Sequence, residues 1–227
     1  MKKTLLIAFM LILCLSLAAC NNSSGSKAGR DASVGDVIQF AGFDWYVLEV
    51  SDGIAKIVSV NLLDSDQYNY VVTKMTWEES SIRENLNGFY LDKFFSDEEK
   101  ALIAETTVVN DDNPWFGTPG GNNTKDKLFL LSVEEVVRYF GDSGLLANRP
   151  EDSVGIHDEY SEARIAAYDR TGIDSWWWLR SPGDGPTQAA LVSQFGTISV
   201  SGFDVAVDDH FPEGRGGIRP ALWLIIE

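Results

Sequence analysis

Alternating apolar and polar residues predict three strands at the start of the folded region. These strands cover residues 37–40, 45–50 and 55–60. The pair Ala41-Gly42 separates the first two strands, and Asp52-Gly53, a typical two-residue hairpin turn, separates the second and third. The folded part of the chain is therefore expected to open with an antiparallel meander.

Three helices are predicted next, and each begins with the same signature. Thr76, Ser96 and Ser132 are each followed by a glutamate three positions later, which is the spacing of a capping box. In the first helix, four apolar residues recur at helical spacing and are expected on one buried face: Ile82, Leu86, Phe89 and Tyr90. These side chains indicate core packing rather than a ligand site.

The later part of the chain returns to strands. Apolar segments predict strands at residues 127–131, 188–193, 197–200, 203–207 and 218–226, with Gly196 and Gly202 in turns. A weaker helix is predicted over residues 161–168. Strands at both ends with helices between them predict an α+β domain, in which helices grouped in the middle of the chain pack on an antiparallel sheet.

Two apolar runs near the C-terminus share an unusual chemistry. In the first, three consecutive tryptophans (residues 176–178) precede an arginine, and neighbours on a strand point to opposite faces, so both faces must be covered. In the second, an arginine and a proline precede another tryptophan. We expect the two runs to be neighbours in one core. Their structural residues are Trp177, Trp178, Arg180, Pro182, Gly183, Arg219, Pro220 and Trp223.

The prolines and glycine of these runs make specific local predictions. Pro182 and Gly183 predict a type II turn, in which Gly183 adopts a positive φ. Pro220 has no N–H to donate, so it is expected at a strand start, an edge or a bulge.

Arg180 and Arg219 are both flanked by apolar residues, so their charges need partners. One interpretation is a structural ion pair with a carboxylate such as Asp174 or Asp184. The other is a guanidinium fork that binds a ligand carboxylate. A long apolar run is a costly place for an unpaired charge, which favours the structural interpretation.

Residues 1–19 have the pattern of a secretory leader: two lysines, an apolar run (residues 5–17) and small residues before Cys20. The last four residues, Leu-Ala-Ala-Cys, resemble the bacterial lipoprotein signal. That resemblance implies cleavage before Cys20 and a lipid on Cys20, which anchors a protein to a membrane face without spanning it. The alternative is an ordinary secretory signal, in which Cys20 is incidental.

The leader sets the expected domain organisation and cellular location of the protein. Residues 20–33 lack apolar content and are predicted to form a flexible tether. Residues 34–227 then form a single domain, without a second cysteine for a disulfide. The expected location is the cell membrane, on its extracellular face, with the membrane as a partner through the lipid on Cys20.

The chain is strongly acidic, with a net charge of −16. Such a surface repels phosphate backbones, so nucleic acid is not expected as a partner. One interpretation of the acidic excess is solubility outside the cell. The other is that some of the carboxylates bind a cation, which requires them to cluster locally.

Several motifs resemble the bacterial family known as domain of unknown function 6273. They are Thr76-Trp77-Glu78, residues 82–87, Phe94-Phe95, residues 127–132, residues 177–183 and residues 217–222, in the family's order. The resemblance implies a surface or secreted protein of Gram-positive bacteria with no established activity. The closing pattern is also similar to the C-type-lectin-like fold shared with sulfatase-modifying enzymes, which implies architecture rather than function.

The sequence gives little support for catalysis. The two histidines, His157 and His210, are not at a metal-ligand spacing, and a Gly-x-Ser-x-Gly elbow and a phosphate-binding glycine loop are both missing. The sulfatase-modifying enzymes depend on cysteine chemistry, which a domain without cysteine cannot perform. We expect no catalytic residues, although an envelope enzyme that uses carboxylates stays an alternative.

Two loops combine oxygen ligands with aromatic rings and are the candidate binding sites. Their residues are Asn110, Asp111, Asp112 and Trp115 in the first loop, and Asp208, Asp209, His210, Phe211 and Glu213 in the second. Loop oxygens suit calcium, and a ring flanked by planar polar groups suits a sugar. The alternative is that the loops need Asp and Asn for their turns and that Trp115 covers the core.

No cofactor is expected, with calcium as the one weak candidate, because neither loop has the regular spacing of a calcium-binding loop. The sequence therefore predicts a lipid-anchored surface protein with a non-catalytic recognition domain, for an envelope glycan or a surface protein. Besides the envelope enzyme, the remaining alternative is a structural protein–protein interaction module.

Overall fold

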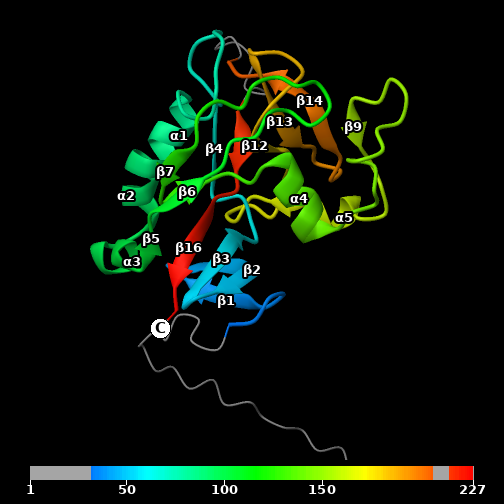
Figure 1. The fold of residues 1–227 in the computed structure, drawn as a ribbon. Coiled ribbons are helices and arrows are strands. Elements are labelled where there is room, and N and C mark those ends of the chain that lie inside the picture. Colours follow the sequence, from blue (N-terminus) through cyan, green and yellow to red (C-terminus); the bar gives the residue numbers. More distant parts are fainter. Residues whose placement is uncertain (1–31, 207–214, 227) are drawn as a thin grey trace, which may run out of the picture.

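A computed structural model of the chain describes residues 32–206 and 215–226 (Figure 1). Within these residues the strands form two six-stranded sheets and two short two-stranded ones. No helix in the described ranges is long and apolar enough to cross a bilayer. The α+β class is confirmed, but the main strands lie in two sheets instead of one.

The first sheet contains both ends of the domain. Its strands are β1 (Val37–Phe40), β2 (Phe43–Ser51), β3 (Ile54–Ser59), β5 (Ile103–Ala104), β8 (Leu128–Phe129) and β16 (Ala221–Ile225). They have the order β1-β2-β3-β16-β5, and β8 also pairs with β16. The last strand of the chain is thus the centre of this sheet.

The second sheet contains the tryptophan run. Its strands are β4 (Asp64–Asp66), β9 (Gly155–Ile156), β12 (Trp177–Pro182), β13 (Gln188–Val192), β14 (Ile198–Asp204) and β15 (Gly216–Ile218), in the order β4-β15-β12-β13-β14-β9. The two-stranded sheets pair β6 (Thr106–Val108) with β7 (Thr124–Asp126), and β10 (Ala166–Ala167) with β11 (Asp174–Ser175).

The helices lie in the middle of the chain and on two flanks of the molecule. They are α1 (Ser81–Asn85), the π-helical turn η1 (Leu86–Tyr90), α2 (Leu91–Phe94), α3 (Asp97–Ala101), α4 (Val133–Phe140) and α5 (Ser161–Arg164). In Figure 1, α1 to α3 lie on one side of the sheets and α4 and α5 on the other. The predicted helix over residues 161–168 ends early, because Ala166 and Ala167 form β10.

The predicted meander is confirmed, together with its turns. Strand β2 pairs antiparallel with β1 and β3. Positive φ angles occur at both residues of each turn: 53° and 77° at Ala41-Gly42, and 48° and 79° at Asp52-Gly53. Two successive positive φ angles are the property of a type I′ turn, whose twist matches the flanking strands.

Two of the three predicted helix starts are confirmed. Ser96 and Ser132 each form a full capping box with the glutamate three residues later. The start at Thr76 is wrong, since α1 begins at Ser81 and its N-cap is Ser80. Residues 77–79 form a turn instead, which buries the indole of Trp77.

The predicted buried face of the first helix is correct except for Phe89. Ile82, Leu86 and Tyr90 are buried, whereas Phe89 is exposed. The π-helical turn η1 explains the difference, because it has more residues per turn than an α-helix and so changes which residues share a face.

The two C-terminal apolar runs are neighbours, as predicted. Strands β12 and β15 pair in parallel, with Trp177 opposite Gly217. The indoles of Trp177 and Trp178 are fully buried, and each donates to a backbone carbonyl, Arg164 O at 3.2 Å and Asp66 O at 3.0 Å. The tryptophan run and the second C-terminal run therefore lie side by side in one core.

Two glycines have a different role from the one predicted. Strand β12 continues through Pro182, and Gly183 does not have a positive φ. A Cβ on Gly183 would lie 2.3 Å from Ser201 O, so the glycine is required for a close backbone approach. Residues 198–204 form one strand rather than two, with Gly202 at a bulge where φ is 76°. Val207, the predicted end of the second strand, lies outside the described residues.

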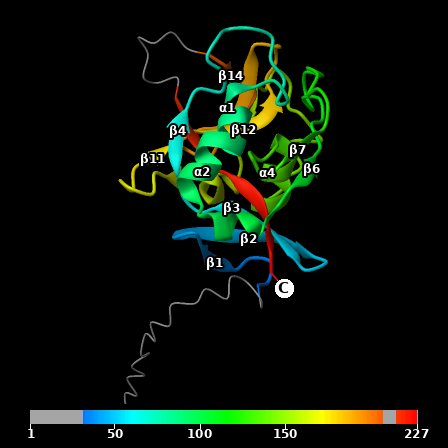
Figure 2. The ribbon, with the colours of Figure 1, turned by 90° about the vertical axis from the view of Figure 1, so that its left-hand side faces the viewer.

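The chain changes sheets at Arg219-Pro220. Strand β15 belongs to the second sheet and β16 to the first, so the predicted single strand over residues 218–226 is interrupted. In Figures 1 and 2 the red C-terminal ribbon runs from one sheet to the other. Pro220 directly precedes β16, at a strand start as predicted, and its carbonyl accepts from Ser59 N at 3.0 Å.

Arg219 is buried at this crossing, and the predicted carboxylate partner is wrong. Its guanidinium donates to three backbone carbonyls, at 3.0 Å to Ser59, 3.2 Å to Val60 and 3.3 Å to Arg164. The guanidinium carbon also lies 4.9 Å from the ring centroids of both Phe140 and Trp177. Burial lowers the pKa of Arg219 to about 10, so the group stays charged at neutral pH.

Candidate functional site

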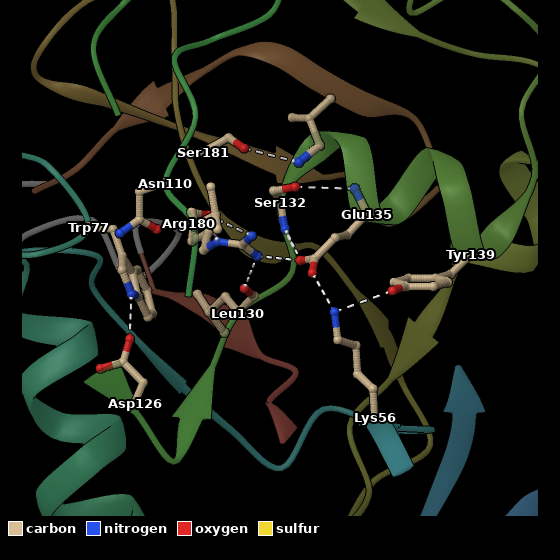
Figure 3. A network of polar contacts seen from close by, with 12 residues as sticks. Lys56, Trp77, Asn110, Asp126, Leu130, Ser132, Glu135, Tyr139, Arg180 and Ser181 are labelled. Carbon is tan, nitrogen blue, oxygen red and sulfur yellow. Dashed lines mark hydrogen bonds and ion pairs between the residues drawn. The ribbon is translucent and has the colours of Figure 1, made fainter. Parts of the chain in front are cut away.

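A buried polar network connects the second sheet to α4. The capping box of Ser132 places Glu135 in the first turn of α4, where its carboxylate accepts from Ser132 N at 3.0 Å. The same carboxylate accepts from Lys56 Nζ at 2.9 Å and from the guanidinium of Arg180 (Figure 3). One acidic side chain therefore binds two buried cations and a helix N-terminus.

Arg180 has structural partners, but not the predicted ones. Its acidic partner is Glu135 rather than Asp174 or Asp184. Its other N–H groups donate to Leu130 O at 2.9 Å and Val109 O at 3.0 Å. With its donors directed to groups of the chain itself, this guanidinium does not provide a fork for a ligand carboxylate.

The network extends from Lys56 towards the surface. Lys56 Nζ lies 5.0 Å from the ring centroid of Trp223 and donates to Tyr139 Oη at 3.3 Å. Tyr139 Oη in turn donates to Glu49 at 2.8 Å, and Arg138 lies 3.5 Å from the same carboxylate. Burial, the hydrogen bond to Glu49 and nearby acidic charge raise the pKa of Tyr139, so it stays protonated.

Electrostatics keep Glu135 ionised, the opposite of what a general acid requires. Burial on its own raises its pKa, but the charges of Arg180 and Lys56 and their hydrogen bonds outweigh burial and hold the pKa at about 2. A general acid at neutral pH needs the opposite shift. Because ionised Glu135 binds both Lys56 and Arg180, this network fixes α4 against the two sheets.

A hollow of about 650 Å³ lies where this network reaches the surface. Its walls are mainly apolar, with the Glu49–Arg138 ion pair and Tyr139 among the polar groups. The lining residues are Val34, Gly35, Tyr46, Val47, Leu48, Glu49, Val50, Arg138, Tyr139, Phe140 and Ala163. Charges of both signs line this hollow, and they already satisfy one another.

The first predicted binding loop is held tightly by its own amides. Asn110 is buried, and its side-chain N–H group donates to Asn122 O at 2.8 Å. Asn113 donates to Pro182 O at 2.7 Å and to Val200 O at 2.8 Å, which fixes the loop to β12 and β14. These amides stabilise the loop, as the alternative interpretation of the sequence expects.

The remaining candidates of this loop do not converge on a ligand. Asp111 is exposed, and Asp112 accepts from Gly120 N at 3.1 Å. Trp115 is half-buried and donates to Leu146 O at 2.9 Å, with the Arg149 guanidinium 5.2 Å from its ring centroid. Within the described ranges, no three His, Cys, Asp or Glu side chains form a group that could hold a metal ion.

The second predicted loop and the lipidation site cannot be placed. Asp208, Asp209, His210, Phe211, Glu213 and Cys20 lie outside the described residues. The other histidine, His157, contacts Thr197 Oγ1 at 3.0 Å.

A second hollow, of about 580 Å³, is lined by aromatic and neutral polar residues. We call it the aromatic hollow and define it by its lining: Trp176, Leu191, Ser193, Gln194, Phe195 and Phe203. Phe195 is 67% exposed and Phe203 46% exposed, which is unusual for two phenylalanines that line the same concavity. This combination makes the aromatic hollow the best candidate for a binding site.

Glycine at position 216 allows Trp176 to occupy one wall of this hollow. A Cβ on Gly216 would lie 2.4 Å from the Trp176 ring and 2.6 Å from Trp178 Nε1. Trp176 packs edge-on against Trp178, with 4.7 Å between the ring centroids, and its centroid lies 6.3 Å from that of Phe203. The indole is therefore held by a buried neighbour and leaves its outer part accessible.

Phe195 projects from a hairpin whose backbone is fixed. Ser193 Oγ accepts from the N–H groups of Phe195 and Thr197, both at 3.2 Å. Gly196 has a φ of 74°, and a Cβ there would lie 1.7 Å from Ser161 O, so the turn rests directly on α5. Because the backbone of this turn is already fixed, ligand binding orders only the side chain of Phe195 and not the loop.

Sequence reasoning missed most of this hollow. It assigned Trp176 to the core run and did not single out Gln194, Phe195 or Phe203 as ligand-binding residues. One local signal was present, because a phenylalanine beside the turn glycine of a β-hairpin has no strand face on which to be buried.

Comparison with known proteins gives a family but no activity. The family model described as "Domain of unknown function (DUF6273)" matches residues 52–226. No curated protein and no solved structure matches the chain. The matched region includes the polar network from Lys56 onward and the whole lining of the aromatic hollow.

The pKa of Glu135 predicts an acid-sensitive contribution to stability. Because its folded pKa of about 2 lies below the ordinary value of 4.5, ionised Glu135 stabilises the protein fully above about pH 5, and this contribution is lost as the pH falls towards 2. Glu135→Gln should therefore lower the free energy of unfolding by roughly 3 kcal/mol at pH 7. The difference in free energy of unfolding between the variant and wild type should narrow below about pH 4.

Urea unfolding between neutral and acidic pH measures this effect, with the exposed Glu98→Gln as the control that should follow wild type. A Glu135→Gln deficit that is equally large at acidic and at neutral pH would contradict the assignment.

Proposed function

Since the chain belongs to the DUF6273 family, we propose that its domain is a non-catalytic recognition module which binds an envelope glycan. In this proposal the domain is carried by a lipoprotein on the extracellular face of the cell membrane of a Gram-positive bacterium. The aromatic hollow is the binding site.

One observation carries the proposal: accessible aromatic rings line a concavity that also presents a neutral amide. Sugars have apolar C–H faces and polar edges, so they fit a site with rings for the faces and a Gln or Ser side chain for the edges. Gln194 and Ser193 supply these polar groups beside Phe195. In Figure 1 the strands that carry the hollow lie in the half of the molecule away from β1.

A protein partner is the second candidate, and a different surface favours it. Tyr70, Val71 and Val72 are consecutive and exposed. They lie on the loop between β4 and α1, which in Figures 1 and 2 arches over the end of the molecule opposite β1. Three adjacent exposed apolar residues suit contact with a protein.

The alternative function, an envelope enzyme that uses carboxylates, receives little support from the pKa values of the buried carboxylates. Burial acts to raise the pKa of Asp158, but hydrogen bonds from Arg164 and Ser143 lower it overall. Asp158, like Glu135, is thus held in the charged form, whereas a general acid needs a raised pKa. We therefore prefer the recognition module to the enzyme.

The proposed lipid-anchored location rests on the leader (residues 1–19), Cys20 and the tether (residues 20–33). We also propose a C-type-lectin-like architecture for residues 34–227. Two features support it: the central strand β16 at the end of the chain pairs with β3 near its start, and β12 lies beside β15.

Removal of the most exposed ring of the hollow should weaken recognition without unfolding the protein. Phe195→Ala is expected to weaken binding of the glycan identified on a cell-wall glycan array by at least about tenfold, or roughly 1.4 kcal/mol. Isothermal titration calorimetry measures the affinity, and the melting temperature should stay near that of wild type because the ring is exposed. Phe89→Ala removes an equally exposed ring outside the hollow and should bind like wild type.

Equal affinities of Phe195→Ala and wild type would refute the aromatic hollow as the site. Turnover of a cell-wall substrate by the wild-type protein would favour the enzyme instead.

The lipid anchor gives a separate prediction. Wild type and Cys14→Ala should incorporate a fatty-acid label in growing cells, whereas Cys20→Ala should not, because only Cys20 follows the small residues of the lipoprotein signal. Gel fluorescence of the labelled protein measures incorporation. A labelled Cys20→Ala variant, or an unlabelled wild type, would rule out lipidation at Cys20.

A further inference from the structure

We infer that the aromatic hollow takes an uncharged pyranose of the glucose or N-acetylglucosamine type and binds it without a metal ion. The inference rests on the proposed function, since it specifies which glycan the same hollow accepts. Three properties of the hollow carry it: the charge of its lining, the kind of polar group it presents and the accessible surface of its rings.

The lining excludes charged glycans by its composition. The six described residues that line it are all neutral, in a chain with a net charge of −16. A polyanionic wall polymer would be repelled by the acidic chain and would meet no cation among the described lining residues. A cationic sugar would be attracted at long range, but it would meet no carboxylate in the described part of the lining. An uncharged sugar is the class that fits.

The polar groups of the hollow are suited to direct hydrogen bonds. Gln194 offers two N–H donors and a carbonyl acceptor, and these match neutral hydroxyl and acetamido groups. Calcium-dependent binding needs several carboxylate or carbonyl oxygens around the ion, and none of the lining residues that the structure describes carries a carboxylate. The sugar is therefore bound through its own hydroxyls.

The rings select the shape of the sugar. In a glucose-type pyranose the hydroxyl groups are equatorial, so both faces of the ring present C–H groups. Such a face packs against Phe195, which extends from the hairpin without a ring partner among the described residues. In a galactose-type ring the oxygen at C4 is axial, so one of the two faces carries a polar group that would lose water without gaining a partner, and only the other face packs on an aromatic ring.

The size of the hollow is consistent with more than a single sugar ring. Its volume of about 580 Å³ lies within the usual range for small-molecule sites, roughly 300–1,000 Å³. Trp176 and Phe203 pack against each other on one wall, and Phe195 projects separately from the hairpin. Short oligosaccharides are therefore the suitable probes.

The test is calorimetry on the full lipoprotein in detergent, with four probes. Cellotetraose and chitotetraose are neutral and of the glucose type, β-1,4-galactotetraose is neutral with an axial oxygen at C4 of each ring, and poly(glycerol phosphate) is anionic. We expect the first two to bind, unchanged by EDTA and by salt between about 0.05 and 0.5 M. Galactotetraose should bind at least about tenfold more weakly, and poly(glycerol phosphate) should not bind.

Two variants show that binding occurs in the hollow. Phe195→Ala and Phe203→Ala should each lose affinity for cellotetraose, while Phe89→Ala should keep it. Circular dichroism and thermal melts check that each variant is folded, and Phe195 provides the cleaner result because its ring is the more exposed.

The outcomes separate this inference from the proposed function. Binding of poly(glycerol phosphate) alone, binding that EDTA removes, or a preference for galactotetraose would overturn the inference and leave glycan recognition standing. If the folded protein binds none of these probes and no glycan on a wall-derived array, both are overturned.

Discussion

The crossing of the chain at Arg219-Pro220 is the constraint on which the rest of the structure depends. One continuous segment supplies an inner strand to each six-stranded sheet, β15 to the second and β16 to the first. A buried guanidinium lies between them and donates to three carbonyls from two other segments of the chain. Arg219 provides many donors in a fixed geometry, so a single side chain can bind carbonyls of two separate segments at the point where the chain leaves one sheet for the other.

The aromatic hollow depends on this crossing through β15. Gly216 begins β15 and lies against the indole of Trp176, while Gly217 pairs with Trp177 in β12. A shift of β15 would therefore move one wall of the hollow directly. Further along β12, Glu135 holds Arg180 and the start of α4. The tryptophan strand is thus held by β15 along one edge and by Glu135 through Arg180.

Local features of this fold could be predicted from the sequence, and features set by distant contacts could not. The type I′ turns and the capping boxes at Ser96 and Ser132 depend on a few adjacent residues, and they are present as expected. The partner of Arg180 is a glutamate 45 residues away, selected by the position of α4 rather than by sequence spacing. Likewise, Phe195 and Trp176 become one site only after β12, β13 and β14 pair.

The most direct test of a single core is native-state hydrogen exchange on Arg219→Met, compared with the exposed Arg138→Met. Removing Arg219 takes a donor from the carbonyls of Ser59, Val60 and Arg164, of which Arg164 O keeps the Trp177 indole, so the account predicts a loss of about 3 kcal/mol in opening free energy. That loss should be the same at the Ser59 amide in the first sheet and the Arg180 amide in the second. The account would be contradicted if Arg219→Met lowered protection in only one sheet. It would also be contradicted if the loss of opening free energy were no greater than in Arg138→Met.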